Sequence, residues 1–341
     1  MTEAQRAALA NWLAEQAGAV RATIEEICEL SGGAIQENWL IRVTMNGGLL
    51  PGCSELVLRT DSPSRVAQSH SRAQEFALLK VAQTTGMTVP EALFLDNEGA
   101  AIGKPAYVMR RAAGTANPRQ LTRDPALDPH RPSLAKSLGQ EIARLHRIKP
   151  PHPKLGFLGP APTAPASQRA ESFLVELDTL PTPLPILEWG RRWLARNAPA
   201  SDRVVLCHGD YRIGNVMVDG ARITGILDWE FASWGDPIED IGWLCARCWR
   251  FGVDDREVGG VGARADLYRG YEAEVGYLVD WSSVPYWEVM ATIRWGIIAH
   301  HQGLRHTSGA ESSMELALTG RKAVEMELDV LNQIRRIEEG T

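Results

Sequence analysis

This 341-residue sequence has no apolar run near the ~18 residues that a membrane-spanning helix requires. It has no block of basic residues and its net charge is −6, so we expect neither a membrane nor a nucleic acid as a partner. Its first residues do not follow the charged-then-apolar pattern of a secretion signal. Its five cysteines are scattered and odd in number, as in proteins with reduced thiols. Together these absences predict a cytoplasmic protein.

The order of the predicted elements indicates a small sheet followed by a larger helical region. We predict a helix over residues 4–30, because Trp12, Leu13, Ile24 and Ile27 lie at helical spacing. The next elements predict an antiparallel sheet with one crossing helix: strands at 39–45, 55–60, 91–95 and 105–110, and a helix at 71–82.

Glycine and proline become frequent from about residue 113, and the sequence after that is mainly helical in pattern. The predicted helices are 133–147, 168–177, 186–197 and most of 236–338, with short strands at 203–207, 215–219 and 222–227. The prediction is an α+β fold with two lobes: a sheet-rich N-lobe over residues 1–110 and a helical C-lobe over 111–341. A cleft between two such lobes is a natural ligand site.

The polar residues most informative about chemistry follow the short strand that ends at Cys207. Asp210 lies in a tight turn, Asn215 follows five residues later, and Asp228 comes after the next two strands. An aspartate can act as a base toward a hydroxyl, while carboxylate and amide oxygens suit Mg²⁺. The spacing between Asp210 and Asn215 equals that of the protein-kinase catalytic loop. The segment therefore predicts phosphoryl transfer.

These motifs resemble the aminoglycoside phosphotransferase family of kinase-like enzymes. The resemblance rests on His208-Gly209-Asp210 with Asn215, and on Ile226-Leu227-Asp228. The longer run from Ile226 to Pro237 is similar to a subgroup that includes kinase-like domains fused to acyl-CoA dehydrogenases. The resemblance covers about residues 25–305 and implies a bilobal, protein-kinase-like fold.

The resemblance also implies a role for each matching residue. Asp210 matches the catalytic base, and Asn215 and Asp228 match the Mg²⁺ ligands. Glu75 matches the glutamate that orients a phosphate-binding cation, and Asp240 matches an aspartate that braces the catalytic loop. Residues 107–111, with Tyr107 and Met109, match the hinge whose backbone holds adenine.

Two positions depart from the family pattern. Arg59 occupies the strand position that usually carries a phosphate-binding lysine, and it offers a planar fork instead of a point charge. The chain has no Gly-x-Gly-x-x-Gly loop, so Ser31, Gly32 and Gly33 would cover the phosphates with fewer glycines. These departures motivate an alternative in which the protein binds nucleotide as a regulatory pseudokinase.

Other residues keep more than one interpretation. We expect His208 to brace the catalytic turn, although a metal-dependent hydrolase could use it together with Asp210 and Asp228. Glu230 could bind a second metal, contact substrate or anchor packing. His300 and His301 could contact substrate or serve the fold alone.

The expected cofactors are Mg²⁺ and a nucleotide, with ATP favoured and GTP left open. The expected partner is a small molecule with a hydroxyl group. Residues 151–200 hold five basic and four acidic side chains, so they lack the acidic concentration that a cationic aminoglycoside would favour. The subgroup resemblance points instead to a metabolic hydroxyl, on a hydroxy acid or a hydroxyacyl thioester.

Overall fold

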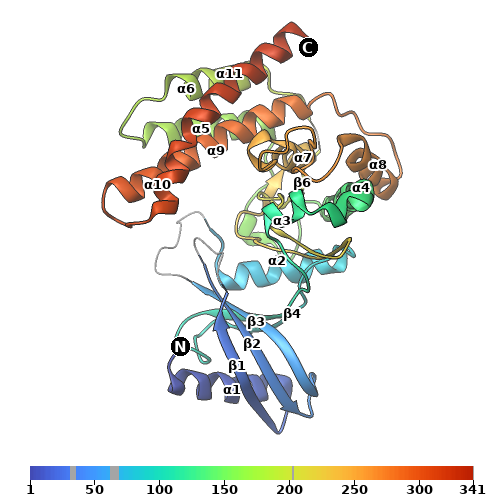
Figure 1. Ribbon diagram of the computed structural model, residues 1–341, viewed down its shortest axis with the longest axis vertical. Coiled ribbons are helices and arrows are strands. Elements are labelled where there is room, and N and C mark those ends of the chain that lie inside the picture. Colours follow the sequence, from blue (N-terminus) through green and yellow to red (C-terminus); the bar gives the residue numbers. More distant parts are fainter. Residues whose placement is uncertain (31–35, 62–68, 202, 341) are drawn as a thin grey trace.

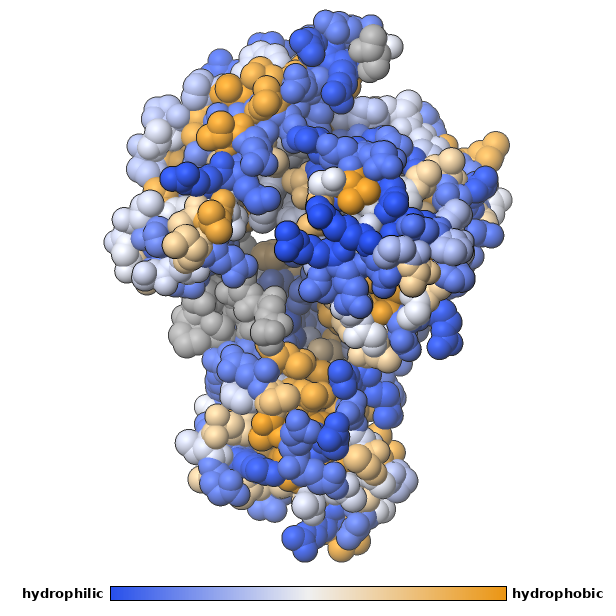
Figure 2. Space-filling model, viewed as in Figure 1, coloured by the Kyte–Doolittle hydropathy of each residue, from blue (hydrophilic) through white to orange (hydrophobic). Residues whose placement is uncertain are grey.

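The structure is a computed structural model that describes residues 1–30, 36–61, 69–201 and 203–340. It has two parts (Figure 1): an N-terminal sheet with a helix on each face, and a larger, mainly helical C-terminal part. The surface is hollowed where the two parts meet (Figure 2). Among the described residues, none of the helices combines the length and the hydropathy needed to cross a bilayer.

The N-terminal sheet has five antiparallel strands in the order β1-β2-β3-β5-β4. The strands are β1 (Arg21–Glu29), β2 (Gln36–Asn46), β3 (Gly52–Asp61), β4 (Ala92–Asp96) and β5 (Ala106–Arg110). Residues 47–51 join β2 to β3 directly, whereas the chain between β3 and β4 includes helix α2 (Arg72–Thr84), and β5 lies between β3 and β4 in the sheet.

The prediction of one helix over residues 4–30 is wrong. Helix α1 (Glu3–Ala17) ends at Gly18, which adopts a left-handed backbone with φ 62° and donates its N–H to Ala14. The chain then forms β1, where Ala22 and Ile24 are buried in alternation with exposed neighbours. Glycine at this position ends a helix at little steric cost, and the β-branched residues beyond it favour a strand.

The two faces of the sheet pack against different partners. Leu56 and Leu58 of β3 face the apolar cluster that contains α1. Val57, with Tyr107 and Met109 of β5, belongs to the cluster that contains helix α2 (Arg72–Thr84) and the C-terminal core. Because side chains alternate along a strand, Arg59 lies on the same face as Val57. The strand period therefore directs Arg59 toward α2 and the C-terminal part.

The C-terminal part is built around the long helix α9, which packs against α5, α6, α7, α10 and α11. Its helices are α3 (Pro118–Arg123), α4 (Arg131–Leu145), α5 (Pro165–Asp178), α6 (Pro185–Arg196), α7 (Pro237–Cys245), α8 (Arg264–Val275), α9 (Val284–Thr307), α10 (Met314–Arg321) and α11 (Ala323–Glu339), with 3-10 turns η1 (Pro125–His130), η2 (Gly156–Leu158) and η3 (Arg247–Trp249).

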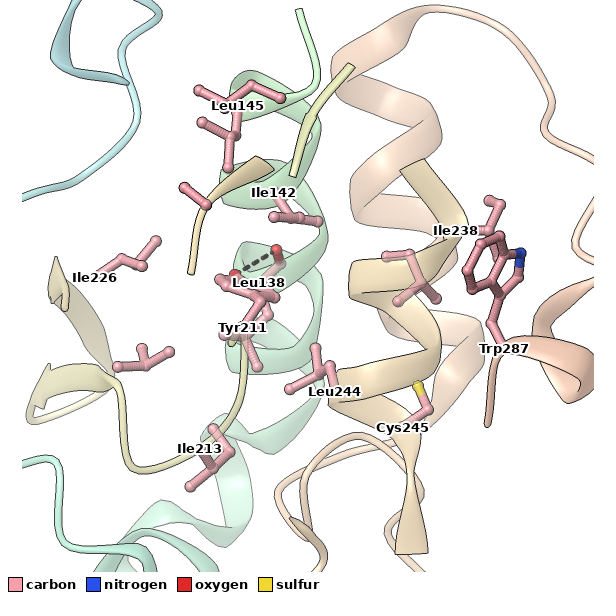
Figure 3. Close-up of a cluster of buried hydrophobic side chains, with 14 of the residues drawn as sticks. Leu138, Ile142, Leu145, Tyr211, Ile213, Ile226, Ile238, Leu244, Cys245 and Trp287 are labelled. Carbon is pink, nitrogen blue, oxygen red and sulfur yellow. Dashed lines mark hydrogen bonds between the residues drawn. The ribbon is translucent and has the colours of Figure 1, made fainter. Parts of the chain in front are cut away.

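Four short strands lie between α6 and α7. Strand β6 (Val205–Cys207) pairs with β9 (Ser233–Gly235), and β7 (Val216–Asp219) pairs with β8 (Arg222–Ile226). The loop between β6 and β7 is fastened to the core by Tyr211, which points toward α4 among Leu138 and its neighbours (Figure 3). The Tyr211 hydroxyl donates to the Leu138 carbonyl at 2.9 Å.

Candidate active site

The turn that carries Asp210 requires a glycine before it. Gly209 has φ 77°, and a Cβ added there would lie 2.3 Å from the Phe231 carbonyl oxygen. Asp210 itself is half-buried, whereas Tyr211 is fully buried in the core. The turn therefore anchors Tyr211 in the core and presents the Asp210 carboxylate at the edge of the C-terminal part.

Three donors hold the Asp210 carboxylate. Asn215 Nδ2 donates to Oδ2 at 2.6 Å, Trp243 Nε1 donates to Oδ1 at 2.8 Å, and Arg212 Nε donates to Oδ1 at 3.1 Å. Asn215 Nδ2 also donates to the Asp210 carbonyl at 2.9 Å. An ionised carboxylate accepts about four hydrogen bonds, so one acceptor direction is left on Oδ2.

Asp240 of α7 braces the backbone of the same turn. Its carboxylate accepts from the N–H groups of His208 at 2.7 Å and of Gly209 at 3.0 Å. His146 Nε2 lies 3.2 Å from the same carboxylate, and its Nδ1 lies 2.9 Å from the Tyr271 hydroxyl. Burial alone would raise the pKa of Asp240, but His146, His208 and the His208 N–H outweigh it and lower that pKa.

His208 is locked in one neutral tautomer. Its Nδ1 accepts from the Asp210 N–H at 3.2 Å, and its Nε2 faces the Leu227 carbonyl at 2.9 Å. Since a backbone N–H only donates and a carbonyl only accepts, the proton lies on Nε2. Burial lowers the pKa of His208 against the pull of the Asp240, Asp210 and Asp228 carboxylates. Both ring nitrogens are therefore engaged in bracing the turn.

Asp228 reaches the site through an unusual backbone conformation. Its φ is 61°, a left-handed value that costs a non-glycine residue about 1–3 kcal/mol. The adjoining Leu227 N–H donates to the Asn215 carbonyl at 2.8 Å, which holds Asn215 and Asp228 side by side. Asp228 Oδ1 lies 3.0 Å from Arg59 Nη1, so this carboxylate ties the C-terminal part to the sheet.

A buried network surrounds Arg59 on the other side of the site. Arg59 Nε donates to Glu75 Oε2 at 2.9 Å, and both side chains are buried. Arg72 Nη1 and the Tyr107 hydroxyl reach the same oxygen at 2.7 and 3.1 Å. Burial would lower the pKa of Arg59, but Glu75 and Asp228 outweigh it and hold that pKa well above its usual value. Arg59 therefore remains a cation.

Two buried atoms of this network have no hydrogen-bond partner within the described part of the chain: Arg59 Nη2 and Glu75 Oε1. A buried guanidinium nitrogen without a partner is costly, and an anion such as a phosphate oxygen would satisfy it. Asn215 turns its amide nitrogen to Asp210, which directs its amide oxygen away from that residue. With the Asp228 carboxylate beside it, that oxygen fits the hard-ligand preference of Mg²⁺.

The other residues predicted for nucleotide binding lie in different settings. Tyr107 is buried within β5 opposite Arg59, and its hydroxyl is used on Glu75. Met109 is buried on the same strand, near the connection to the C-terminal part. Ser31, Gly32 and Gly33 lie outside the described residues.

Glu230, His300 and His301, whose roles the sequence leaves open, have well-defined positions in the structure. Glu230 is buried, and its carbonyl accepts from the His70 N–H at 3.0 Å. His300 and His301 lie further along α9, and burial lowers the pKa of His300.

Sequence reasoning missed several side chains that build this site. Arg294 of α9 donates to the Gly209 carbonyl at 2.7 Å, and its guanidinium lies 4.6 Å from the Trp243 ring centre. Trp243 of α7 donates to the Asp210 carboxylate, and His146, at the end of α4, bonds to Asp240. Arg72 could have been found, because it precedes Glu75 by three residues on the same helix face. No local pattern marks Arg294.

A buried group of His146, Cys207 and Asp240 has ligand atoms within 4.8 Å of one another. These atoms already have partners: His146 bonds to Asp240 and Tyr271, Asp240 also bonds to the turn, and the Cys207 thiol donates to the Asp236 carbonyl at 3.3 Å. Burial also raises the pKa of Cys207 well above its usual value, which disfavours a thiolate ligand. The group therefore functions as part of the brace.

Comparisons with known proteins identify a family for the chain. The model of the phosphotransferase enzyme family (APH) matches residues 26–276. Acyl-CoA dehydrogenase family member 10 of Mus musculus is 27% identical over 199 residues, which cover 56% of this chain and 18% of that protein. Family member 11 of Rattus norvegicus is 28% identical over 205 residues, covering 58% and 26%. The chain thus aligns with about a quarter or less of these relatives' length.

Solved structures show the same fold. A Ralstonia eutropha protein named for the aminoglycoside phosphotransferases superposes with a TM-score of 0.74 at 19% identity, over 97% of this chain and 98% of that one. The GDP and kanamycin complex of APH(2″)-IIIa superposes with a TM-score of 0.59 at 15% identity, over 94% and 98%. The α+β, kinase-like fold expected from the sequence is confirmed, and the chain belongs to the phosphotransferase enzyme family (APH).

Proposed function

We propose that this protein is a Mg²⁺- and ATP-dependent kinase that phosphorylates a hydroxyl group of a small metabolic acceptor. The observation that carries the proposal is the convergence of Asp210, Asn215 and Asp228. Asn215 lies 2.6 Å from the Asp210 carboxylate, and the chain beside Asp228 is bonded to Asn215. A base and two metal-ligand oxygens are what phosphoryl transfer requires of a protein.

In this proposal Arg59 binds nucleotide phosphates through its free Nη2, and Glu75 holds the guanidinium in place. Asn215 and Asp228 hold Mg²⁺, which when bound neutralises charge on the transferred phosphoryl group. The backbone near Tyr107 and Met109 holds the base of the nucleotide. Residues Ser31, Gly32 and Gly33 cover the phosphates.

Asp210 acts as the base. It accepts the proton of the acceptor hydroxyl at its open Oδ2 direction while the hydroxyl oxygen attacks the γ-phosphorus. The Asn215 bond keeps the carboxylate in orientation during this step. The neutral His208 and the Asp240 carboxylate act only on the backbone of the turn, since their polar atoms are already engaged.

The charges near Asp210 favour an acceptor that is not a polycation. Arg294 donates to the Gly209 carbonyl and has no carboxylate partner among the described residues, whereas Arg212 is paired with Asp210 and Arg169 with Glu239. Guanidinium groups repel an aminoglycoside and attract a carboxylate. Together with the relatives named as acyl-CoA dehydrogenase family members, this supports a hydroxy acid or a hydroxyacyl thioester as acceptor.

Nucleotide binding is tested by thermal unfolding with Mg·ATP and Mg·GTP. Ligand at about 100 times its dissociation constant adds ~2.7 kcal/mol of stability, which a melting curve resolves. Turnover is tested by screening hydroxy acids, hydroxyacyl thioesters and aminoglycosides for phosphorylation. Phosphorylation of aminoglycosides alone would overturn the metabolic acceptor, whereas nucleotide binding without any turnover would favour the regulatory pseudokinase.

The base is tested by Asp210→Asn. This change should lower turnover by about 10²- to 10⁴-fold while nucleotide affinity stays close to the wild-type value, because the amide cannot accept the proton. Asp219→Asn, on the exposed β7–β8 turn, is the matched control and should leave turnover unchanged. Full turnover of Asp210→Asn would refute the assignment.

A further inference from the structure

One face of α7 binds three consecutive residues, His208, Gly209 and Asp210, which we call the catalytic turn. Asp240 and Trp243 are three residues apart on this helix and therefore lie on the same side. Asp240 binds the N–H groups of His208 and Gly209, and Trp243 donates its indole N–H to the side chain of Asp210 at 2.8 Å. The same helix thus sets both the backbone of the turn and the carboxylate that it presents.

Trp243 is held too firmly to rearrange. Its side chain is buried, and the Arg294 guanidinium covers one side of its ring at 4.6 Å. The Trp249 ring lies 5.3 Å away. Helix α7 itself is pressed against α9, because a Cβ on Gly242 would come within 2.4 Å of Trp287.

The second donor to the same carboxylate oxygen differs in this respect. Arg212 reaches Asp210 Oδ1 at the longer distance of 3.1 Å, and 24% of its side chain is exposed. Although the Arg212 guanidinium lies 4.5 Å from the Trp249 ring centre, a partly exposed arginine has more room to move than a buried indole. Trp243 is therefore the more firmly fixed of the two donors to Oδ1.

We propose that Trp243 is a positioning residue for Asp210: its indole N–H fixes Oδ1 so that Oδ2 faces the acceptor hydroxyl. This inference rests on the proposed kinase function. Catalysis by a base depends on its orientation toward the reacting proton. Without the Trp243 N–H, the Asp210 carboxylate would lose a charge-assisted hydrogen bond that fixes this orientation.

The test compares Trp243→Phe with Trp287→Phe. Both changes delete a buried indole N–H near the α7–α9 contact, but the Trp287 N–H has no hydrogen-bond partner among the described residues. Turnover is measured with Mg·ATP and water as the acceptor, by release of inorganic phosphate. We expect kcat of Trp243→Phe to fall about 10- to 100-fold, with KM for Mg·ATP changed by less than about twofold. Trp287→Phe should keep the wild-type kcat at a similar loss of stability.

Equal kcat values in the two variants would overturn the positioning role while leaving the kinase function intact. If the wild-type protein releases no phosphate with water as acceptor, the contact is tested by NMR instead, and the kinase function is decided by the acceptor screen. The indole N–H resonance of Trp243, assigned in the wild-type protein, should move upfield in Asp210→Ala while that of Trp287 stays in place. An unmoved Trp243 resonance would overturn the inference even if Trp243→Phe does not fold.

Discussion

The two sides of the candidate site differ in how completely their buried polar atoms are partnered. One side holds the catalytic turn (residues 208–210), to which the side chains of Asp240, His208 and Asn215 form hydrogen bonds of 2.6–3.2 Å. On the sheet side, Arg59 Nη2 and Glu75 Oε1 have no hydrogen-bond partner within the described ranges. The backbone of the turn is thus fully braced by the protein itself, whereas buried atoms on the sheet side are left for a ligand.

The difference follows from what supports each side. The catalytic turn is enclosed by α4, α7 and α9, which supply Leu138, Asp240 and Arg294 to its backbone or its neighbours. Arg59 donates to Glu75 of α2 and to Asp228 of the C-terminal part, and its Nη2 has no partner among the described residues. Removing a partner should therefore damage stability on the first side and ligand affinity on the second.

The largest expected effect is on the catalytic-turn side. Asp240→Ala leaves the His208 and Gly209 N–H groups buried without acceptors, and we expect it to lower the free energy of unfolding by about 3–5 kcal/mol. Asp254→Ala is the control, since its exposed ion pair with Arg247 contributes about 1 kcal/mol or less. Urea unfolding measures both. Similar losses in the two variants would contradict the claim that the turn depends on its buried brace.

An intermediate effect is expected on the sheet side. Arg59→Lys keeps the charge but cannot reach Glu75, Asp228 and a ligand at once, because an ammonium lacks the planar fork. Losing one charge-assisted hydrogen bond should weaken Mg·nucleotide binding by roughly tenfold. Titration calorimetry measures the affinity, with Arg42→Lys on the exposed side of β2 as control. Unchanged affinity in Arg59→Lys would show that the fork is dispensable.

The smallest effect is a pH dependence of stability from His208. The pKa of His208 in the folded protein lies below its ordinary value of 6.5. Between the folded pKa and 6.5, His208 is therefore protonated in the unfolded chain and neutral in the folded protein. Stability from this group is fully present above pH 6.5 and decreases as the pH falls toward the folded pKa, by at most about 1.4 kcal/mol per pH unit. His208→Gln should remove this slope, while His130→Gln, at an exposed site, should retain it. Urea unfolding across this range measures the slope, and identical slopes in all three proteins would contradict the assignment.

Much of the architecture was predictable because it depends on local patterns. Alternating β-rich segments predicted four strands of the sheet, and Ser71 begins α2 with a capping box that also marks the helix in the sequence. The prediction failed at residues 4–30, where apolar spacing suits both a helix and a strand, and Gly18 decides between them. The turn sequence around Asp210 indicates phosphoryl transfer from residue types and spacing alone.

The residues that hold the site were less predictable. Arg294 and Trp243 act on the turn from helices that follow it in the chain, and His146 acts from a helix that precedes it. No motif in the sequence around any of these side chains marks it as part of the site. Their contacts depend on which helix faces are buried together, and helical periodicity identifies a face without identifying what it meets.

The sequence alone determined which chemical groups this protein carries: two carboxylates, a carboxamide and a strand arginine, at spacings that short loops and strands maintain. Tertiary structure decided how these groups are held. It brought Arg59 of the sheet within 3.0 Å of Asp228 and placed Trp243 on the Asp210 carboxylate. Local backbone preferences act over a few residues, whereas the contacts between distant segments exist only once the core has packed.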